Sequence, residues 1–156
     1  MMRFHRANIA EVTPPSYNAK TGQETVKIIS QFKDESEAVV GTLEVSYSFH
    51  YLMEGVKTFA WWQTDHACLI DDHGRYLAHT EAIMKGKNRF GESNDPFELH
   101  LLEAIKKKPF GTVLGPGRPP DQVGGFYRLK YAPWTIVIFA PGEKVLAPII
   151  QFRNYY

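Results

Sequence analysis

The 156-residue sequence predicts an α+β protein with a central antiparallel sheet flanked by helices, preceded by an N-terminal strand pair and a connecting helix. Three observations indicate this class. Strand-type runs and helix-type periodicities follow one another in the order strand, strand, helix, strand, strand, strand after residue 65. A polar break ending in Gly74 separates two apolar runs. A strong helix start stands at Asp95-Pro96.

The N-terminal third predicts two strands and a helix. Residues 25–32 are rich in β-branched side chains, and residues 38–46 return antiparallel after a polar turn. Residues 1–16 show little periodicity and end in an extended or turn segment. From Ser48 onward the apolar spacing becomes helical, with Ser46 or Ser48 as the N-cap. The apolar positions of this helix are Phe49, Leu52, Met53, Val56 and Phe59 or Ala60.

Residues 67–80 predict a β-hairpin, because a glycine after a polar run accepts the positive φ of a tight turn. We expect a two-residue turn at His73-Gly74. That register would place Asp72 opposite Arg75, Ile70 opposite Leu77, Cys68 opposite His79 and His66 opposite Glu81.

The next helix begins with Asp95 as N-cap and Pro96 as first residue, with Glu98 completing a capping box, and it reaches about Lys108. Its buried stripe is expected at Phe97, Leu101, Leu102 and Ile105. Residues 110–114 form a strand, and the proline-rich residues 115–120 form an irregular loop. Residues 122–131 and 134–140 form an antiparallel pair, and residues 141–144 turn into a last helix.

Composition excludes several classes of function. The net charge of +1 does not favour a nucleic-acid partner. A single cysteine, Cys68, excludes an internal disulfide, and no run of about 20 apolar residues or signal peptide occurs. No phosphate loop, nucleophile elbow or zinc-protease helix is found. The run 106–108 fits a solvated helix C-terminus.

The order of these motifs resembles the Cache family, the extracytoplasmic sensor domains of bacterial histidine kinases, chemoreceptors and diguanylate cyclases. In double-Cache terms, residues 1–58 resemble the C-terminal part of a membrane-distal lobe with its connecting helix. Residues 59–156 resemble the membrane-proximal, PAS-like sensor module. The segments that carry the resemblance are Gly41-Thr42-Leu43-Glu44-Val45, Cys68-Leu69-Ile70-Asp71 with Gly74 and Leu77-Ala78-His79, residues 123–127, residues 132–137 and an exit helix near 145–149.

The resemblance implies a small-molecule sensing domain of a transmembrane receptor, most often a two-component sensor histidine kinase. It implies no catalysis by this domain, no cofactor, and a small organic ligand such as a carboxylate or an amino acid. It further implies a homodimeric full-length receptor anchored in the inner membrane, with this part in the periplasm. A membrane span would then follow soon after Tyr156.

The expected ligand site lies on the sheet of the second module, bounded by Arg89, Tyr127 and the Trp61–Trp62 region. Arg89 precedes the capped helix and suits bidentate binding of a carboxylate. Dense aromatic side chains supply the apolar walls that small-molecule pockets need. The candidate ligand-binding residues are Arg89, Tyr127, His79, Trp62 and Trp134. For the aromatic residues packing is the competing interpretation, and for Arg89 it is a solvated loop position.

Two alternatives remain at the level of sequence. The predicted hairpin register gathers His66, Cys68, His79 and Glu81, which are zinc-ligand types, so a metal-binding or hydrolytic domain is one alternative. A buried structural cysteine with hydrogen-bonded histidines is the competing interpretation of that cluster. The second alternative is a dimerisation module that binds no ligand.

Overall fold

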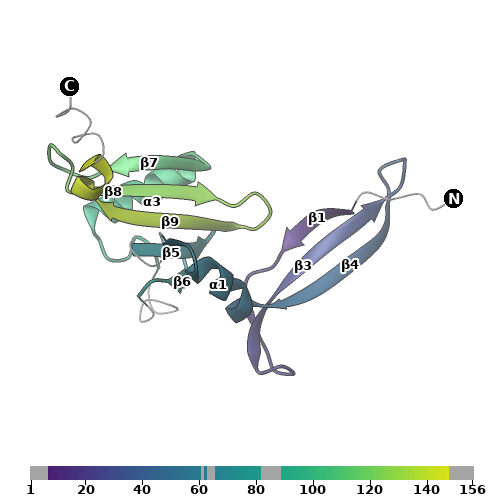
Figure 1. Cartoon of the computed structure of the whole chain (residues 1–156). Coiled ribbons are helices and arrows are strands. Elements are labelled where there is room, and N and C mark those ends of the chain that lie inside the picture. The colour runs from purple at the N-terminus through teal and green to yellow at the C-terminus, as the bar shows by residue number, and fades with distance from the viewer. Residues whose placement is uncertain (1–6, 61, 63–65, 82–88, 148–156) are drawn as a thin grey trace. The chain divides into compact units, whose positions relative to one another are not determined.

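The computed structural model describes residues 7–60, 62, 66–81 and 89–147. The chain divides into two compact units (Figure 1). The first comprises residues 1–57 together with 129–133, and the second comprises residues 58–128 and 134–156. Each unit contains its own antiparallel sheet, so the predicted α+β class is confirmed.

The sheet of the first unit is built around one long strand, β3 (Gln23–Lys33). One edge of β3 pairs with β1 (Ala7–Val12) and β2 (Ser16–Asn18), and the other edge pairs with β4 (Val39–Ser48). The predicted strand pair corresponds to β3 and β4. Strand β1 was missed because a register shift between Ile9 and Glu11 breaks the alternation of side chains that marks a strand.

Helix α1 (Phe49–Lys57) follows β4 directly and packs on β3. The Ser48 hydroxyl accepts a hydrogen bond from the Tyr51 N–H at 3.4 Å, as expected of an N-cap. Phe49 and Met53 are buried, which confirms the predicted apolar stripe. The helix ends before Phe59, whose side chain is exposed.

The second unit holds a five-stranded antiparallel sheet in the order β6-β5-β9-β8-β7. Its strands are β5 (His66–Asp71), β6 (Tyr76–His79), β7 (Phe110–Leu114), β8 (Gln122–Arg128) and β9 (Trp134–Pro141). Helix α3 (Pro96–Lys107) connects β6 to β7. The predicted order of one helix among five strands is therefore confirmed.

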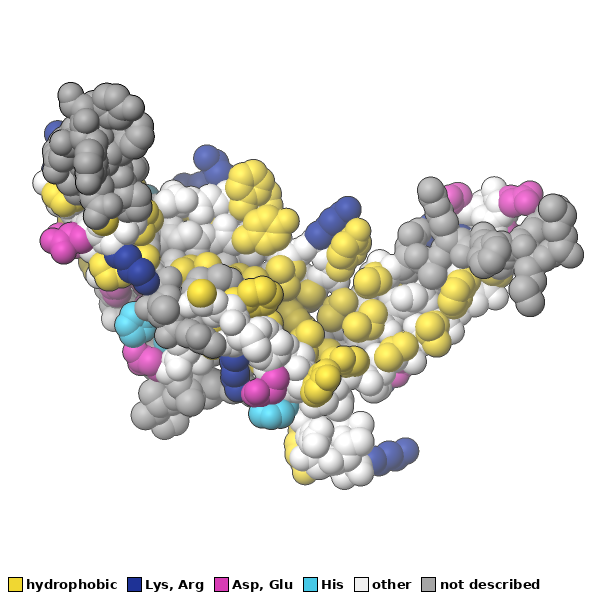
Figure 2. All heavy atoms as spheres, in the orientation of Figure 1, with side chains coloured by type: hydrophobic (Ala, Val, Ile, Leu, Met, Phe, Trp, Pro, Cys, Tyr) yellow, Lys and Arg dark blue, Asp and Glu magenta, His cyan; other side chains and the backbone are white. Residues whose placement is uncertain are grey.

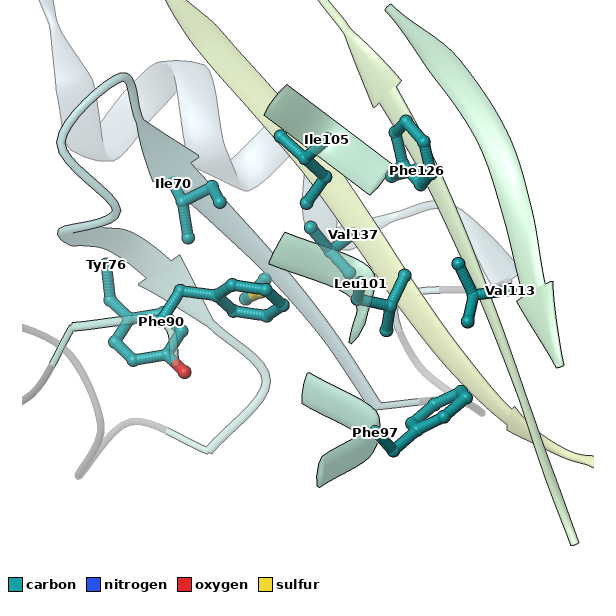
Figure 3. Packing of buried hydrophobic residues seen from close by; sticks show 10 residues of the cluster. Ile70, Tyr76, Phe90, Phe97, Leu101, Ile105, Val113, Phe126 and Val137 are labelled. Atoms are coloured by element: carbon teal, nitrogen blue, oxygen red, sulfur yellow. The ribbon is translucent and has the colours of Figure 1, made fainter. Parts of the chain in front are cut away.

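The core of this unit lies between α3 and one face of the sheet. Val137 and Phe126 of the sheet lie beside Leu101 of the helix (Figure 3), and Cys68 belongs to the same buried cluster. The approach is close: a Cβ added at Gly124 would lie 2.5 Å from Leu101 Cδ1. The absence of a side chain at Gly124 therefore lets the helix pack at this distance from the sheet.

The hairpin between β5 and β6 forms, but its turn differs from the prediction. The Asp71 N–H bonds the Arg75 carbonyl and the Gly74 N–H bonds the Asp71 carbonyl, which makes a three-residue loop of residues 72–74. Gly74 has φ of 76°, as predicted. Ile70 consequently lies opposite Tyr76 rather than Leu77.

A second irregularity restores the predicted pairing further along. The register shifts between Leu69 and Ile70, so that Leu69 pairs with Ala78 and Cys68 with His79. The additional residue on the β6 side is Leu77, which forms a bulge. The three-residue loop and the bulge compensate, and the expected Cys68–His79 pair is confirmed.

Helix α3 begins as predicted, but without its capping box. The Asp95 side chain accepts a hydrogen bond from the Phe97 N–H at 3.1 Å, with Pro96 as the first helical residue. Glu98 does not bond the Asp95 N–H, whose partner is the Ser93 hydroxyl. The predicted capping box is therefore wrong, because other donors engage the Glu98 carboxylate.

After β9, residues 142–147 are helical, in agreement with the predicted last helix. The remainder of the proposed exit segment and the terminal tyrosines lie outside the described residues. Within the described part of the chain, no helix combines the length and apolar character needed to cross a bilayer.

Candidate functional site

Two of the predicted ligand-binding residues, Tyr127 and Trp134, lie on the sheet face that points away from α3. Tyr127 pairs with Ile136, while its neighbour Phe126 pairs with Val137 in the core. Because side chains alternate along a strand, Trp134 shares a face with Ile136. Trp134 is buried, whereas Tyr127 is 54% exposed and stacks on Phe110 with ring centroids 6.4 Å apart.

Arg89 lies beside the hairpin turn. Its backbone forms an isolated bridge with Arg75, and its own N–H donates to Glu92 Oε2 at 3.0 Å. The exposed side chain has Nε 4.0 Å from Glu92 Oε1, a distance at which an ion pair in water is weak. Arg89 thus has a carboxylate neighbour within its own loop.

His79 belongs to the face that carries the core, since it pairs with Cys68. Its ring meets Tyr76 edge-on at 5.3 Å, and its Nδ1 accepts a hydrogen bond from the Glu81 N–H at 2.8 Å. Burial lowers the pKa of the His79 imidazole below its ordinary value. Trp62 is buried as well, while Trp61 lies outside the described residues.

The five predicted residues are thus not gathered on one face of the sheet. Tyr127 and Trp134 share one face, His79 lies on the other, and Arg89 lies near the turn. Their role in binding stays a prediction.

The hairpin cluster does not form a metal site. His66 and Glu81 approach one another, with Nδ1 and Oε1 3.4 Å apart, as the register predicted. Cys68, however, is fully buried in the core, and burial raises the pKa of its thiol, which opposes the thiolate that binds metals. Among the residues that the structure describes, no group of three or more His, Cys, Asp or Glu side chains is arranged to hold a metal ion. The metal-binding or hydrolytic alternative is therefore not supported.

A groove of about 590 Å³ opens between the second half of α3 and strand β7. This volume lies within the usual range for sites of small organic molecules. The helix contributes His100, Glu103, Ala104 and Lys107, which follow the i, i+3, i+4, i+7 spacing of one helix face. None of the five predicted residues lines this groove. The remaining lining residues are Lys108, Pro109, Phe110, Gly111, Thr112 and Phe126.

The sequence did not indicate this groove. The lysines of residues 106–108 matched a solvated helix end, and the structure does expose all three. The sequence does contain one related pattern. The groove-lining residues of α3 form a stripe one position away from the apolar stripe of Phe97, Leu101 and Ile105. A charged stripe beside a buried stripe is ordinary for a surface helix, so only the position of β7 distinguishes it.

Comparison with solved structures establishes the fold. The extracellular domain of mmHK1S-Z3, assigned as a histidine kinase, matches with a TM-score of 0.61 at 19% identity, over 90% of this chain and 52% of that one. The ligand-binding domain of the Pseudomonas fluorescens chemoreceptor CtaA, in complex with L-isoleucine, matches at 0.53 and 18%, over 89% and 55%. The periplasmic sensory domain of the Campylobacter jejuni chemoreceptor Tlp1 matches at 0.54 and 16%, over 88% and 50%.

This chain has the fold of a receptor sensor domain. The Cache-type fold that the sequence predicted is thereby confirmed. No protein-family model and no curated protein sequence matches the chain. The chain spans about half the length of these solved sensor domains.

Proposed function

We propose that this chain is part of an extracytoplasmic small-molecule sensing domain of a transmembrane receptor, with a sensor histidine kinase as the favoured parent. The observation that carries the proposal is the fold, which it shares with the extracellular and periplasmic sensor domains of a histidine kinase and two chemoreceptors. The domain itself recognises a ligand and performs no turnover. Catalysis, in this proposal, belongs to the output domain of the parent protein.

The two parts of the chain would then have different places in the receptor. Residues 1–58 would be the C-terminal part of a membrane-distal lobe, and residues 59–156 the membrane-proximal module. The first unit supports this division, because β4 pairs only with β3 among the described strands. Leu43, Val45 and Tyr47 on that strand are 40–48% exposed. An edge this long and apolar is usually covered in a complete domain.

The ligand class is a small organic molecule, a carboxylate or an amino acid. The chemoreceptor CtaA supports this class, since its similar domain was solved with L-isoleucine and with L-leucine. Arg89, Tyr127, His79, Trp62 and Trp134 remain the residues that the sequence nominates for this role. In the receptor, the ligand must bind two conformations with different affinity, because only a differential affinity shifts an equilibrium.

The proposal further places this part of the receptor in the periplasm, anchored to the inner membrane and paired as a homodimer. The extracellular and periplasmic origin of the matching domains supports the location. It predicts an apolar stretch of about 20 residues soon after Tyr156 in the parent sequence. A ligand-free dimerisation module is the competing function.

A ligand screen by thermal shift tests the proposal. Amino acids and organic acids are added to the full chain, and a compound present at 100 times its dissociation constant should stabilise the fold by about 2.7 kcal/mol. Arg89→Ala should weaken binding if that guanidinium holds a carboxylate, whereas Arg118→Ala, in the exposed 115–120 loop, serves as the matched control. If no compound raises the melting temperature, the ligand-free dimerisation module is favoured.

A further inference from the structure

We propose that the groove between α3 and β7 binds a small organic anion that carries an apolar body, such as an aliphatic or aromatic monocarboxylate. The inference rests on the proposed sensing function and assigns a ligand class to a site that the sequence did not nominate.

The apolar part of the groove comes from Ala104, Pro109, Gly111 and Phe126. Phe126 belongs to the buried core cluster and also lines the groove, whereas the Phe110 side chain lies on the opposite sheet face, where it stacks on Tyr127. Gly111 lies directly opposite Phe126 in the β7–β8 pairing. A Cβ at position 111 would lie 3.0 Å from Phe126 Cζ, so the glycine leaves this wall without a side chain. A hydrocarbon body would therefore contact the apolar atoms of Ala104 and Pro109 and the accessible edge of Phe126.

The charged part of the groove lies at the C-terminal end of the helix. Lys107 and Lys108 line the groove together with His100, while Glu103 is its single carboxylate. Lys107 Nζ lies 3.9 Å from Glu103 Oε2, and both side chains are largely exposed. An exposed ion pair at this distance contributes little free energy, so Lys107 is available to an incoming anion. In the described part of the chain, Lys108 forms no ion pair.

Two of the carbonyls near this helix end have donors other than the two lysine side chains. The Arg128 guanidinium donates to the Ile105 carbonyl at 2.7 Å, and the Lys108 N–H donates to the Ala104 carbonyl at 3.0 Å. These bonds satisfy carbonyl groups that a helix C-terminus otherwise leaves open. The side chains of Lys107 and Lys108 are exposed and line the groove.

An apolar lining beside two lysines favours an anion with a hydrocarbon part over zwitterions, alcohols and inorganic phosphate. Two lysines against one glutamate give the lining a net positive charge even with His100 neutral, so a carboxylate gains more than a zwitterion or an alcohol of the same size. Inorganic phosphate has no hydrocarbon part and would gain nothing from the apolar lining at Ala104, Pro109 and Phe126, where a hydrocarbon body would bury apolar surface.

Backbone amide NMR of the full 156-residue chain tests this site, with hexanoate and benzoate as probes and 1-hexanol as the neutral counterpart. We expect saturable shifts confined to the amides of residues 103–112 and 126 with the two acids, and at least fivefold weaker binding of the alcohol. Lys107→Gln with Lys108→Gln should weaken hexanoate binding roughly tenfold, since each charge-assisted contact is removed.

Lys106→Gln is the matched control, because this lysine belongs to the same run but does not line the groove. It should change the affinity less than twofold. An equal loss in Lys106→Gln and in the double variant would overturn the proposal, and so would saturable shifts that map elsewhere or the absence of any saturable shift at 10 mM acid. A ligand found by the thermal-shift screen that binds outside residues 103–112 would overturn the groove assignment and leave the sensing function intact.

Discussion

At the scale of single residues, Asp71 shows how a buried carboxylate organises a turn. Its side chain is fully buried and accepts hydrogen bonds from the His73 N–H and the Arg75 N–H, both at 2.9 Å. The Arg75 Nε lies 2.7 Å from its second oxygen. Burial alone would raise the pKa of the Asp71 carboxyl, but the bonds from Arg75 and His73 outweigh it, and this pKa is lowered.

The lowered pKa of Asp71 predicts a dependence of stability on pH. A group whose pKa is depressed in the folded state stabilises the fold above its unfolded pKa of about 3.9 and loses that contribution as pH falls through its folded pKa. Asp71→Asn should lower the free energy of unfolding by roughly 1–2 kcal/mol at pH 7. Urea denaturation between pH 7 and pH 2 should show the difference from wild type shrinking below about pH 4.

The neighbouring Asp72 provides the control for this measurement. Its side chain is exposed and no backbone N–H bond to it is found in the described hairpin. Asp72→Asn should therefore change the free energy of unfolding by less than about 0.5 kcal/mol. Equal effects of the two substitutions would show that the Asp71 network does not stabilise the turn.

At the scale of elements, the two acidic residues at the start of helix α3, Asp95 and Glu98, have different roles. Asp95 caps the helix, as the local pattern requires. Glu98 is drawn into the protein instead, where Tyr76 Oη donates to its Oε1 at 2.9 Å and the Gly91 N–H does so at 2.9 Å. The Ser93 hydroxyl bonds its other oxygen. Glu98 therefore ties strand β6 and the 91–93 loop to the helix.

Substitution of the two acidic residues at the start of α3 should have unequal effects. Asp95→Ala removes one cap bond and should cost about 1 kcal/mol. Glu98→Ala should cost roughly 2–3 kcal/mol, because it leaves the buried Tyr76 hydroxyl and the Gly91 N–H without their partner. Urea denaturation measures both. Glu103→Ala, exposed on the same helix, is the control and should change stability by less than about 0.5 kcal/mol.

A smaller loss of stability in Glu98→Ala than in Asp95→Ala would contradict this account. The pKa of Tyr76 offers a second readout. Burial and the neighbouring Glu98 carboxylate both raise the pKa of the Tyr76 hydroxyl, so Glu98→Ala should lower it.

At the scale of the whole molecule, the two units differ in how completely their sheets are covered. The second unit encloses a core between α3 and its sheet. The first unit has one polar sheet face, with Lys27 and Glu44 paired at 2.7 Å, and one apolar face. Figure 2 shows hydrophobic side chains in a row along this unit. On β4 the apolar face carries Leu43, Val45 and Tyr47, which pair with Ser30, Ile28 and Val26.

The open edge of β4 predicts that the isolated chain associates at high concentration. A long apolar edge strand offers unpaired N–H and C=O groups to another chain, and a lysine on it opposes such pairing. Leu43→Lys should therefore reduce association in sedimentation velocity at rising concentration. Thr42→Lys, on the polar face of the same strand, should reduce it less. A chain that stays monomeric throughout, or equal effects of the two lysines, would contradict this interpretation.

The sequence by itself determined the elements whose cause is local. The cap at Asp95, the positive φ of Gly74 and the strands β3 and β4 follow from the conformational preferences of a few neighbouring residues. The order of these elements also determined the α+β class. Runs of strands interrupted by single helices are typical of an antiparallel sheet with helices packed on it.

Tertiary structure alone decided the details that depend on distant partners. The bulge at Leu77 and the three-residue loop shift the hairpin register and then restore it, and no local pattern distinguishes that pair of changes from an unbroken ladder. Glu98 left its expected capping position because Tyr76, 22 residues earlier, donates to it. The groove exists because β7 lies beside the charged stripe of α3. In each case the free energy that selects the structure comes from contacts between segments that the sequence does not bring together.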